Sequence, residues 1–430
     1  MALKTEPLWW EAAAPQKICA DPFPEHTDIA IIGSGYVGLS AALELARAGS
    51  SVIVLDRERI GFGASTRNGG QFLPEPKFAM RKQLVNRFGD ALADRILEDG
   101  RAASSTLQEV IDRESIKCHF TQPGRFVGAH CPSAFRTLED KLRQYEAQGI
   151  EGFELIPRHR QHEIAETDYY YGGLLEPGGG TLQPALYHRG LVQACQRNGV
   201  EFCSNTQVDA ITGVSGAFNV HTAKGQIACQ EVIAGTNGYT GKLTPWQRRR
   251  LIPLQSFIIA TEEMDEERVE QMFRNFRGMS NTQRVLFYYR ASPDHRRVVF
   301  GGRASFREIS AAQAAPRMYE YMCRVYPQLR GVALTHSWNG FVAFSFDHLP
   351  HMGTHQDVHY AMGCNGSGVA MMSYLGRQIG LKILGKTHRR CAFEEIPFPT
   401  RPMYSGNPWF LPAIGGWYRL RDNIDRLFAG

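Results

Sequence analysis

The first strongly patterned stretch of the chain, residues 28–56, joins two apolar runs through one amphipathic segment. The four apolar residues at 29–32 are typical of a strand buried on both faces. Apolar residues then recur at every third or fourth position over 37–48, which predicts a helix with one buried face, and Gly49 suits its end. A second apolar run, 52–55, follows at once. This stretch therefore predicts a β-α-β unit.

The pattern further along the chain predicts helices first and a sheet later. Helical spacing predicts helices over residues 79–115 and 133–149. The segment between them, 116–129, has a Pro-Gly pair at 123–124 and predicts a β-hairpin. From residue 251 onward, aromatic and alternating segments predict an antiparallel sheet.

A chain of 430 residues is too long for a single core, so we expect two domains. The predicted fold class is α/β, with a Rossmann-like first domain and a second α+β domain built on the antiparallel sheet. Trp9 and Trp10 should dock the N-terminal arm on the body, because two adjacent tryptophans are costly to expose. The expected division is an arm (1–26), a first domain (27–80, 150–250 and 335–390), a second domain (81–149 and 251–334) and a tail (391–430).

Composition narrows the class of protein. A hydrophobic fraction of 43% predicts a large core, and a net charge of +5 with interspersed signs is no nucleic-acid footprint, so no nucleic acid is expected as a partner. The nine cysteines are scattered without a C-x-x-C pair, which favours reduced thiols over a disulfide framework. No apolar run is long enough for a signal peptide or a transmembrane helix, so the expected compartment is the cytoplasm.

The turn after the first strand carries the clearest chemical signal. Gly33, Gly35 and Gly38 form G-x-G-x-x-G, in which the glycines allow a tight turn, a close approach to a pyrophosphate and close helix packing. Tyr36 and Val37 open the helix that would point at the phosphates. Asp56, at the end of the second strand, is placed to bind a ribose hydroxyl. The alternative is a β-α-β unit that binds no phosphate.

A second segment of small residues follows directly and indicates a longer ligand. An NAD site needs no such segment here, whereas FAD extends away from the first β-α-β unit. The alternative is an ordinary glycine-rich loop. The expected FAD contacts in this segment are Arg57, Gly63, Ala64, Ser65, Thr66, Arg67, Asn68, Gly69, Gly70 and Gln71.

Two later segments complete the expected cofactor site. An apolar strand stops at Gly235, Thr236 and Asn237, as ligand-facing strands do in open α/β sheets, and Val208 could meet an adenine edge. The turn before a late helix would place free N–H groups at the flavin N1–C2 edge. Plain packing glycines are the alternative for that turn, whose residues are Cys364, Asn365, Gly366, Ser367, Gly368 and Val369.

The segments GSGYVGLSAALELARAG, GFGASTRNGGQ, VVFGGR and YAMGCNGSGVAMM together resemble the D-amino-acid-oxidase-like (DAO) family of FAD-dependent oxidoreductases, with glycine oxidase and sarcosine oxidase as relatives. Within it, the chain is most similar to the gamma-glutamylputrescine oxidoreductase branch. The resemblance implies FAD, two domains and oxidation of a C–N bond of an amine or amino acid by hydride transfer to flavin, with electrons passing to O2 or another acceptor. Thr66 and Gln183 depart from the branch, which usually has glycine and histidine there.

Four residues are the candidates on the substrate side. Arg303 follows an apolar strand and two glycines, and Gly302 would leave space for a ring, so its guanidinium could clamp a carboxylate. A structural or flavin-contacting role is the alternative. Tyr288 and Trp338 could line an aromatic pocket, although core packing is the commoner role. His348 could accept a proton, although a structural role is again commoner.

Two other functions stay open from the sequence. One is an NAD(P)-dependent dehydrogenase, and the other is a flavin-binding subunit without turnover in a larger complex. Cys364 could tether the flavin, but its place in the helix-opening turn favours non-covalent FAD. No His, Cys and carboxylate set has metal-ligand spacing, so no metal is expected.

Overall fold

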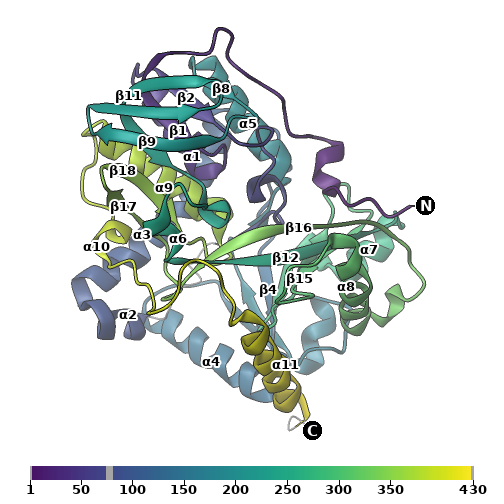
Figure 1. Cartoon of the computed structure of the whole chain (residues 1–430). Coiled ribbons are helices and arrows are strands. Elements are labelled where there is room, and N and C mark those ends of the chain that lie inside the picture. The colour runs from purple at the N-terminus through teal and green to yellow at the C-terminus, as the bar shows by residue number, and fades with distance from the viewer. Residues whose placement is uncertain (1, 74–80, 428–430) are drawn as a thin grey trace.

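The computed structural model describes residues 2–73 and 81–427 and contains two large β-sheets. Figure 1 shows the sheet with β1, β2 and β11 in the upper part of the molecule and the sheet with β12, β15 and β16 below it. The C-terminal helix α11 lies at the lower end, beside the second sheet. The first two residues of the helical segment predicted from residue 79 lie outside the described ranges.

The first sheet contains the predicted β-α-β unit. Its strands run in the order β17-β18-β11-β1-β2-β8, and β9 and β10 extend it as an antiparallel pair beside β11. The contacts from β18 through β8 are parallel, and β17 is an antiparallel edge. The strands are β1 (His26–Ile32), β2 (Val52–Leu55), β8 (Glu201–Cys203), β9 (Val208–Val214), β10 (Ala217–Thr222), β11 (Gly225–Ala234), β17 (His351–His355) and β18 (Val358–Met362).

Three helices pack together beside this sheet. They are α1 (Tyr36–Arg47), α5 (Pro184–Arg197) and α9 (Gly368–Ile383), and they share one apolar core with β1 and β2. α1 and α9 approach each other closely, since a Cβ on Gly376 would lie 2.3 Å from the carbonyl oxygen of Val37. Both helices begin on the side of the sheet where the parallel strands end, as the α/β rule requires.

The second sheet is antiparallel except for one contact. Its order is β16-β12-β15-β14-β13-β4-β6-β5, and β13 and β4 run parallel. The strands are β4 (Arg125–Gly128), β5 (Glu154–Ile156), β6 (Gly173–Glu176), β12 (Leu251–Thr261), β13 (Gly278–Asn281), β14 (Tyr288–Ala291), β15 (Val298–Gly302) and β16 (Leu334–Ser345). A third, two-stranded antiparallel sheet consists of β3 (Gln71–Phe72) and β7 (Gly180–Thr181).

The remaining helices surround the two sheets. None of the helices within residues 2–73 and 81–427 combines the length and apolar content that a membrane span requires. These helices are α2 (Arg81–Phe88), α3 (Asp90–Arg113), α4 (Pro132–Ala147), α6 (Pro245–Arg248), α7 (Glu266–Met272), α8 (Ala311–Val325), α10 (Ala392–Glu395) and α11 (Leu411–Leu427).

Two local expectations from the sequence are wrong. Residues 116–129 form no hairpin, because β4 pairs instead with β6 and β13, which lie far away in the sequence. The ranges 150–250 and 335–390 do not belong wholly with the first sheet, since β5, β6 and β16 are strands of the second. Both differences come from strand pairing over long sequence distances, which local alternation does not encode.

The N-terminal arm packs on the body as expected, with Trp9 1% and Trp10 7% exposed. It is also covalently fastened, because Cys19 forms a disulfide with Cys203 at the end of β8. The expectation of reduced thiols is therefore wrong for this pair. Scattered spacing gave no sign of the pair, whose members are 184 residues apart.

Candidate active site

A large cavity of about 1240 Å³ lies between the two sheets and is lined by residues of both. Its wall includes the end of β1, the start of α1, the segment 61–71 and the start of α9. Strands of the second sheet supply the opposite wall. The volume exceeds the roughly 300–1,000 Å³ of a drug-sized ligand pocket, so the cavity suits an extended cofactor together with a substrate.

The end formed by β1 and α1 has the geometry of a phosphate site. Gly33 turns the chain sharply with φ of +101°, and the N-cap of α1, Gly35, has no side chain that could cap the helix. The Ser65 hydroxyl accepts from the first N–H of the helix, that of Tyr36, at 3.1 Å. Gly38 lies beneath the turn, because a Cβ there would be 2.2 Å from the carbonyl oxygen of Gly33. The N–H groups of the first turn of α1 that follow Tyr36 are left to bind an anion in the cavity.

Asp56 ends β2 on the wall of the same cavity. Its Oδ2 accepts hydrogen bonds from the Ser34 N–H at 2.9 Å and the Ser34 hydroxyl at 2.6 Å, and its Oδ1 accepts from the Glu58 N–H at 3.0 Å. These bonds fix the carboxylate beside the phosphate turn. Oδ1, which accepts only one of these bonds, keeps a lone pair that could accept from a ribose hydroxyl.

The segment 61–71 is held against the arm by aromatic rings. The Arg67 guanidinium lies 4.4 Å from the ring centres of both Trp10 and Phe62, and its Nε donates to the Phe62 carbonyl at 2.7 Å. Burial lowers the pKa of Arg67. Asn68 is fixed by its amide, which donates to the Ser65 carbonyl at 3.0 Å. Arg67 and Asn68 both face the cavity.

The start of α9 is the second helix N-terminus at the cavity. Its N-cap, Ser367, makes no capping hydrogen bond, and the buried Ser367 hydroxyl has no partner among the described residues. The preceding turn is fixed because the Gly363 N–H donates to the Asn237 side chain at 3.0 Å. The helix dipole and these free donors favour negative charge at this point.

Arg303 directly follows β15 on the opposite wall. Its Nε is buried, and no carboxylate or hydrogen-bond acceptor pairs with the guanidinium within the described ranges. Its neighbours are the rings of Phe306 at 5.3 Å and Phe344 at 5.5 Å. Burial lowers the pKa of Arg303 to about 10. A buried cation without a counter-ion is costly, so this position is prepared for an anionic group.

Tyr288 and His348 also border the cavity. The Tyr288 hydroxyl lies 2.9 Å from the Ser256 hydroxyl, and burial raises the pKa of Tyr288, which keeps the phenol protonated. Gly301 makes room for this ring, because a Cβ there would lie 2.1 Å from it. His348 adopts φ of +62° in a turn, so backbone geometry fixes its direction.

The far end of the cavity holds charged residues that the sequence did not indicate. Glu176 lies between Lys141 Nζ at 2.9 Å and the Arg125 guanidinium at 3.6 Å, and Arg125 also donates to the Ser280 hydroxyl at 2.6 Å. Burial disfavours the Lys141 ammonium, but the Glu176 carboxylate and the Tyr145 phenol together outweigh it and raise the pKa of Lys141. These residues come from separate elements, so no sequence motif links them.

Most of the candidates from the sequence meet at this cavity. Those on its wall are Gly33, Gly35, Tyr36, Val37, Asp56, Arg57, Gly63, Ala64, Ser65, Arg67, Asn68, Gly69, Gln71, Val208, Gly235, Thr236, Asn237, Tyr288, Gly302, Arg303, His348, Cys364, Asn365, Gly366, Ser367, Gly368 and Val369. Those not on its wall are Gly38, Thr66, Gly70 and Trp338. Trp338 is fully buried behind the cavity, where its Nε1 donates to the Arg67 carbonyl at 2.8 Å.

The two residues that depart from the family branch both hold the arm. The Thr66 hydroxyl accepts from Trp10 Nε1 at 2.9 Å, a bond that glycine could not make. The Gln183 side chain caps α5 by accepting from the Leu186 N–H at 2.7 Å and donates to the Trp9 carbonyl at 2.9 Å. Neither side chain borders the cavity, so these departures concern the arm rather than the substrate.

One group of possible metal ligands lies within the described residues, at His130, Asp422 and Asp425. The Arg284 guanidinium already bonds both carboxylates, at 3.1 Å to Asp422 and 2.6 Å to Asp425. A cation therefore neutralises this group without a metal ion.

The fold and the cavity define a protein with an extended dinucleotide site beside a substrate wall. Residues 28–380 match the family model described as FAD dependent oxidoreductase, and the chain belongs to this family. It is 30% identical to a gamma-glutamylputrescine oxidoreductase of Escherichia coli (92% of this chain and 93% of that protein covered), and 30% identical to a probable oxidoreductase OrdL of Haemophilus influenzae (89% and 88%). The crystal structure of glycine oxidase from Geobacillus kaustophilus superposes with a TM-score of 0.72 at 17% identity, covering 88% of this chain and 99% of that one.

The residues present fit FAD. Two helix N-termini, those of α1 and α9, open on one continuous cavity, and neither N-cap residue makes a side-chain capping bond. The buried Ser367 hydroxyl lacks a partner among the described residues. The first N-terminus can take the pyrophosphate and the second the electron-rich edge of the flavin ring. The protein is an FAD-dependent oxidoreductase.

Proposed function

We propose that this enzyme oxidises the C–N bond of an amine that carries a distant carboxylate, with gamma-glutamylated polyamines as the substrate class. The observation that carries the proposal is Arg303, a cation on the cavity wall without an anionic partner among the described residues. The 30% identity to a gamma-glutamylputrescine oxidoreductase over most of both chains supports the same class. The proposal places the reaction in the cytoplasm.

The shape of the cavity supports a long substrate. From Tyr288 on β14, the wall continues across β13 and β4 to Glu176 on β6. Three strand spacings of roughly 4.8 Å correspond to roughly 14 Å. The paired charges of Lys141 and Glu176 lie at the far end, where they can meet a polar end group.

Bound FAD would supply the redox chemistry, by accepting a hydride from the carbon next to the amine nitrogen and leaving an imine that water hydrolyses to a carbonyl compound and an amine. Gly33 and Gly35 would hold the pyrophosphate, Asp56 the ribose and Val208 the adenine edge. The α9 N-terminus would stabilise the negative charge that arrives with the hydride. We propose that the cofactor is bound without a covalent link, and that O2 receives the electrons as H2O2.

The chain's own residues would orient the substrate. The Arg303 guanidinium would bind the carboxylate through two parallel hydrogen bonds, which fixes both distance and direction. The Ser256 hydroxyl donates to the Gly302 carbonyl at 3.2 Å, so the Tyr288 phenol donates to Ser256, and its oxygen can accept one hydrogen bond from the substrate without moving. His348 could take the proton that the substrate ammonium must lose before hydride transfer.

The proposal is tested with Arg303→Lys, which keeps the charge but loses the planar fork. We expect KM for the carboxylated amine to rise by about tenfold to a few hundredfold at unchanged flavin content, because a bidentate contact in a partly dry site is worth about 2–4 kcal/mol. The same variant should lose much less on an analogue whose carboxylate is amidated. A peroxidase-coupled assay for H2O2 tests O2 as the acceptor.

The matched control is Arg284→Lys, since Arg284 also borders the cavity but is already bonded to Asp422 and Asp425. It should affect both substrates alike. Equal losses of Arg303→Lys on the two substrates would assign Arg303 to the cofactor or the fold and would contradict the proposal.

A further inference from the structure

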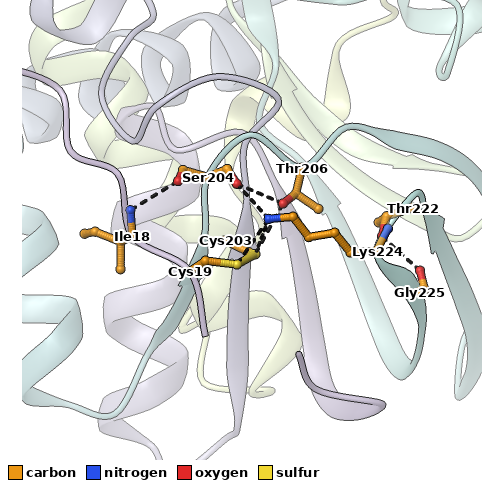
Figure 2. Close-up of a disulfide and its surroundings, with 8 residues drawn as sticks. All are labelled: Ile18, Cys19, Cys203, Ser204, Thr206, Thr222, Lys224 and Gly225. Atoms are coloured by element: carbon orange, nitrogen blue, oxygen red, sulfur yellow. Dashed lines mark hydrogen bonds between the residues drawn. A yellow bond between two sulfur atoms is a disulfide. The ribbon is translucent and has the colours of Figure 1, made fainter. Parts of the chain in front are cut away.

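The disulfide between Cys19 and Cys203 lies outside the catalytic cavity, at the join between the arm and the first sheet (Figure 2). The two residues face each other across an isolated antiparallel bridge. Backbone bonds hold this bridge on both sides, from the Ser204 N–H to the Ile18 carbonyl at 2.7 Å and from the Ala20 N–H to the Phe202 carbonyl at 2.9 Å. The two sulfurs would therefore stay neighbours after reduction.

A lysine lies directly on the sulfur pair. Lys224, in the turn between β10 and β11, places its Nζ 3.2 Å from each of the two Sγ atoms and 3.1 Å from the Ser204 carbonyl oxygen. Figure 2 shows the side chain reaching across to the sulfurs from its own turn. No carboxylate forms an ion pair with Lys224 within the described ranges. The ammonium is thus directed at the sulfurs and at one carbonyl.

The two sulfurs differ in access. Cys19 is an exposed residue of the arm, whereas Cys203 is completely buried at the end of β8. The Thr206 hydroxyl is a second donor on the buried side, and it lies 3.2 Å from the Cys203 Sγ and 2.9 Å from the Ser204 carbonyl oxygen. A reagent from solution would reach Cys19 first, and Cys203 would be the internal partner.

The chemistry of this arrangement follows from the charge. A thiolate, not a thiol, attacks peroxides and disulfides, and a nearby ammonium favours the thiolate. The same ammonium stabilises a thiolate that leaves when a disulfide is attacked, which eases reduction as well. A structural disulfide needs no cation at its sulfurs, whereas a pair that opens and closes is helped by one in both directions.

We propose that Cys19 and Cys203 form a reversible dithiol–disulfide site, with Lys224 as its activating cation and hydrogen peroxide as its oxidant. The Cys19 thiolate attacks one peroxide oxygen, which gives a sulfenic acid on Cys19 and releases hydroxide. The Cys203 thiol then displaces the sulfenic oxygen as water and closes the S–S bond. In the reverse direction, a small thiol attacks the exposed Cys19 sulfur, Cys203 leaves as a thiolate, and a second thiol completes the reduction.

The other cysteines serve as an internal reference for this chemistry. Cys195 and Cys391 are buried, and desolvation raises the pKa of each thiol. They should stay unmodified while the protein is folded. Their alkylation would report unfolding rather than reactivity of the pair.

The test uses the FAD-loaded full-length enzyme. The protein is reduced with dithiothreitol, desalted without oxygen and mixed with hydrogen peroxide; it is then quenched with iodoacetamide at set times and digested for mass spectrometry. We expect the wild-type pair to form the linked Cys19–Cys203 peptide. In Lys224→Met the rate of closure should fall by about tenfold. A positive charge at this distance raises the thiolate fraction by about one to three powers of ten, but a thiolate whose pKa is lowered is also a weaker nucleophile, which offsets part of that gain.

Lys224→Arg is the matched control, since it restores a cation at the same place and should close within about threefold of the wild-type rate. Cys19→Ser should form no internal disulfide. Equal closure rates for wild type and Lys224→Met would overturn the role of Lys224. A pair that dithiothreitol cannot open in the folded enzyme, with Cys195 and Cys391 still protected, would overturn the proposal of a reversible site.

Discussion

At the scale of single residues, the cavity is shaped by positions where a side chain is absent or a charge is left without a partner. Gly35 keeps the phosphate turn open, and Arg303 supplies a positive charge that nothing in the described structure neutralises. Both features reduce the stability of the unliganded protein. Folding removes the backbone freedom of Gly35, and it desolvates the Arg303 cation. Binding sites concentrate such costs, because the ligand offsets them.

Gly35→Val tests the phosphate turn. The backbone of Gly35, with φ of −76° and ψ of −178°, accepts valine, but its Cβ would lie 3.3 Å from the Ser65 hydroxyl and the methyl groups would enter the cavity. We expect a folded protein whose FAD affinity falls at least about a hundredfold, since no space remains for the pyrophosphate. Flavin absorbance after purification measures it.

The control for this variant is Gly241→Val. Gly241 also borders the cavity, but a Cβ there meets nothing within 4 Å. Its flavin content should stay near that of the wild type. A purified Gly35→Val protein that contains one FAD per chain would contradict the assignment of this turn to the pyrophosphate.

Arg303 also predicts a pH dependence. Burial lowers its pKa to about 10, so the unliganded enzyme loses the guanidinium charge as the pH rises through that value. The carboxylate contact should be lost in the same range, whereas deprotonation of the substrate ammonium favours catalysis at higher pH. The ratio of kcat/KM for the carboxylated substrate to that for its amide removes this second effect, because both carry the same amine.

We expect this ratio to fall between about pH 9 and pH 11. It is measured from initial rates of both substrates across that range, with flavin absorbance monitored for loss of cofactor. A ratio that is constant through pH 11 would mean that Arg303 keeps its charge or that the carboxylate binds elsewhere.

At the scale of elements, two helices aim their N-termini at one ligand, and their mutual packing sets that aim. α1 and α9 touch through Gly376, whose missing side chain lets the helix approach Val37. The contact lies at the start of α1 and at the middle of α9, so a change in the spacing of the two helices would move the N-terminus of α1 relative to that of α9. Orientation of the cofactor thus depends on a residue that does not touch it.

Gly376→Val is expected to destabilise the protein by about 1–3 kcal/mol and to reduce flavin content together with stability, because the new Cβ would lie 2.3 Å from the Val37 carbonyl oxygen. Thermal unfolding followed by circular dichroism measures the first effect and flavin absorbance the second. Gly416→Val on α11 is the control, since a Cβ there meets nothing within 4 Å. The control should change stability by less than about 0.5 kcal/mol. Equal stability of the two variants would show that the helices tolerate a wider spacing.

Elements also mark the limit of what the sequence predicts. The β-α-β unit is predicted correctly because all of its information lies within 28–56. The strand β4 is misassigned as part of a hairpin, since its partners β6 and β13 lie about 50 and 150 residues further on. The same reason hides Lys141, Glu176 and Arg125, which come together only when three elements pack. Motif residues are visible from sequence, whereas residues that distant elements bring together are not.

At the scale of the whole molecule, the N-terminal arm ties the two halves of the site together. Trp9 packs edge-on against Trp338 of the second sheet at 5.9 Å, and Trp10 stacks with Arg67 of the cofactor segment at 4.4 Å. Thr66 and Gln183 add hydrogen bonds to the same pair of tryptophans. The arm therefore packs behind the cofactor segment and supports it. The sequence indicated this docking only through Trp9 and Trp10, two adjacent apolar side chains that are costly to expose to water.

Trp10→Ala tests this role of the arm. Truncation removes the ring beneath Arg67 and leaves the buried Thr66 hydroxyl without its donor, so we expect a loss of about 3–5 kcal/mol in the free energy of unfolding and weaker retention of FAD. The control is Trp409→Ala, because Trp409 is 69% exposed and should change stability by less than about 0.5 kcal/mol. Denaturant unfolding and flavin release during gel filtration measure both variants. If Trp10→Ala unfolded at the same denaturant concentration as Trp409→Ala and kept its flavin, the arm would be a passive cover, and the fixed position of Arg67 would have to come from Phe62 and Asn339 alone.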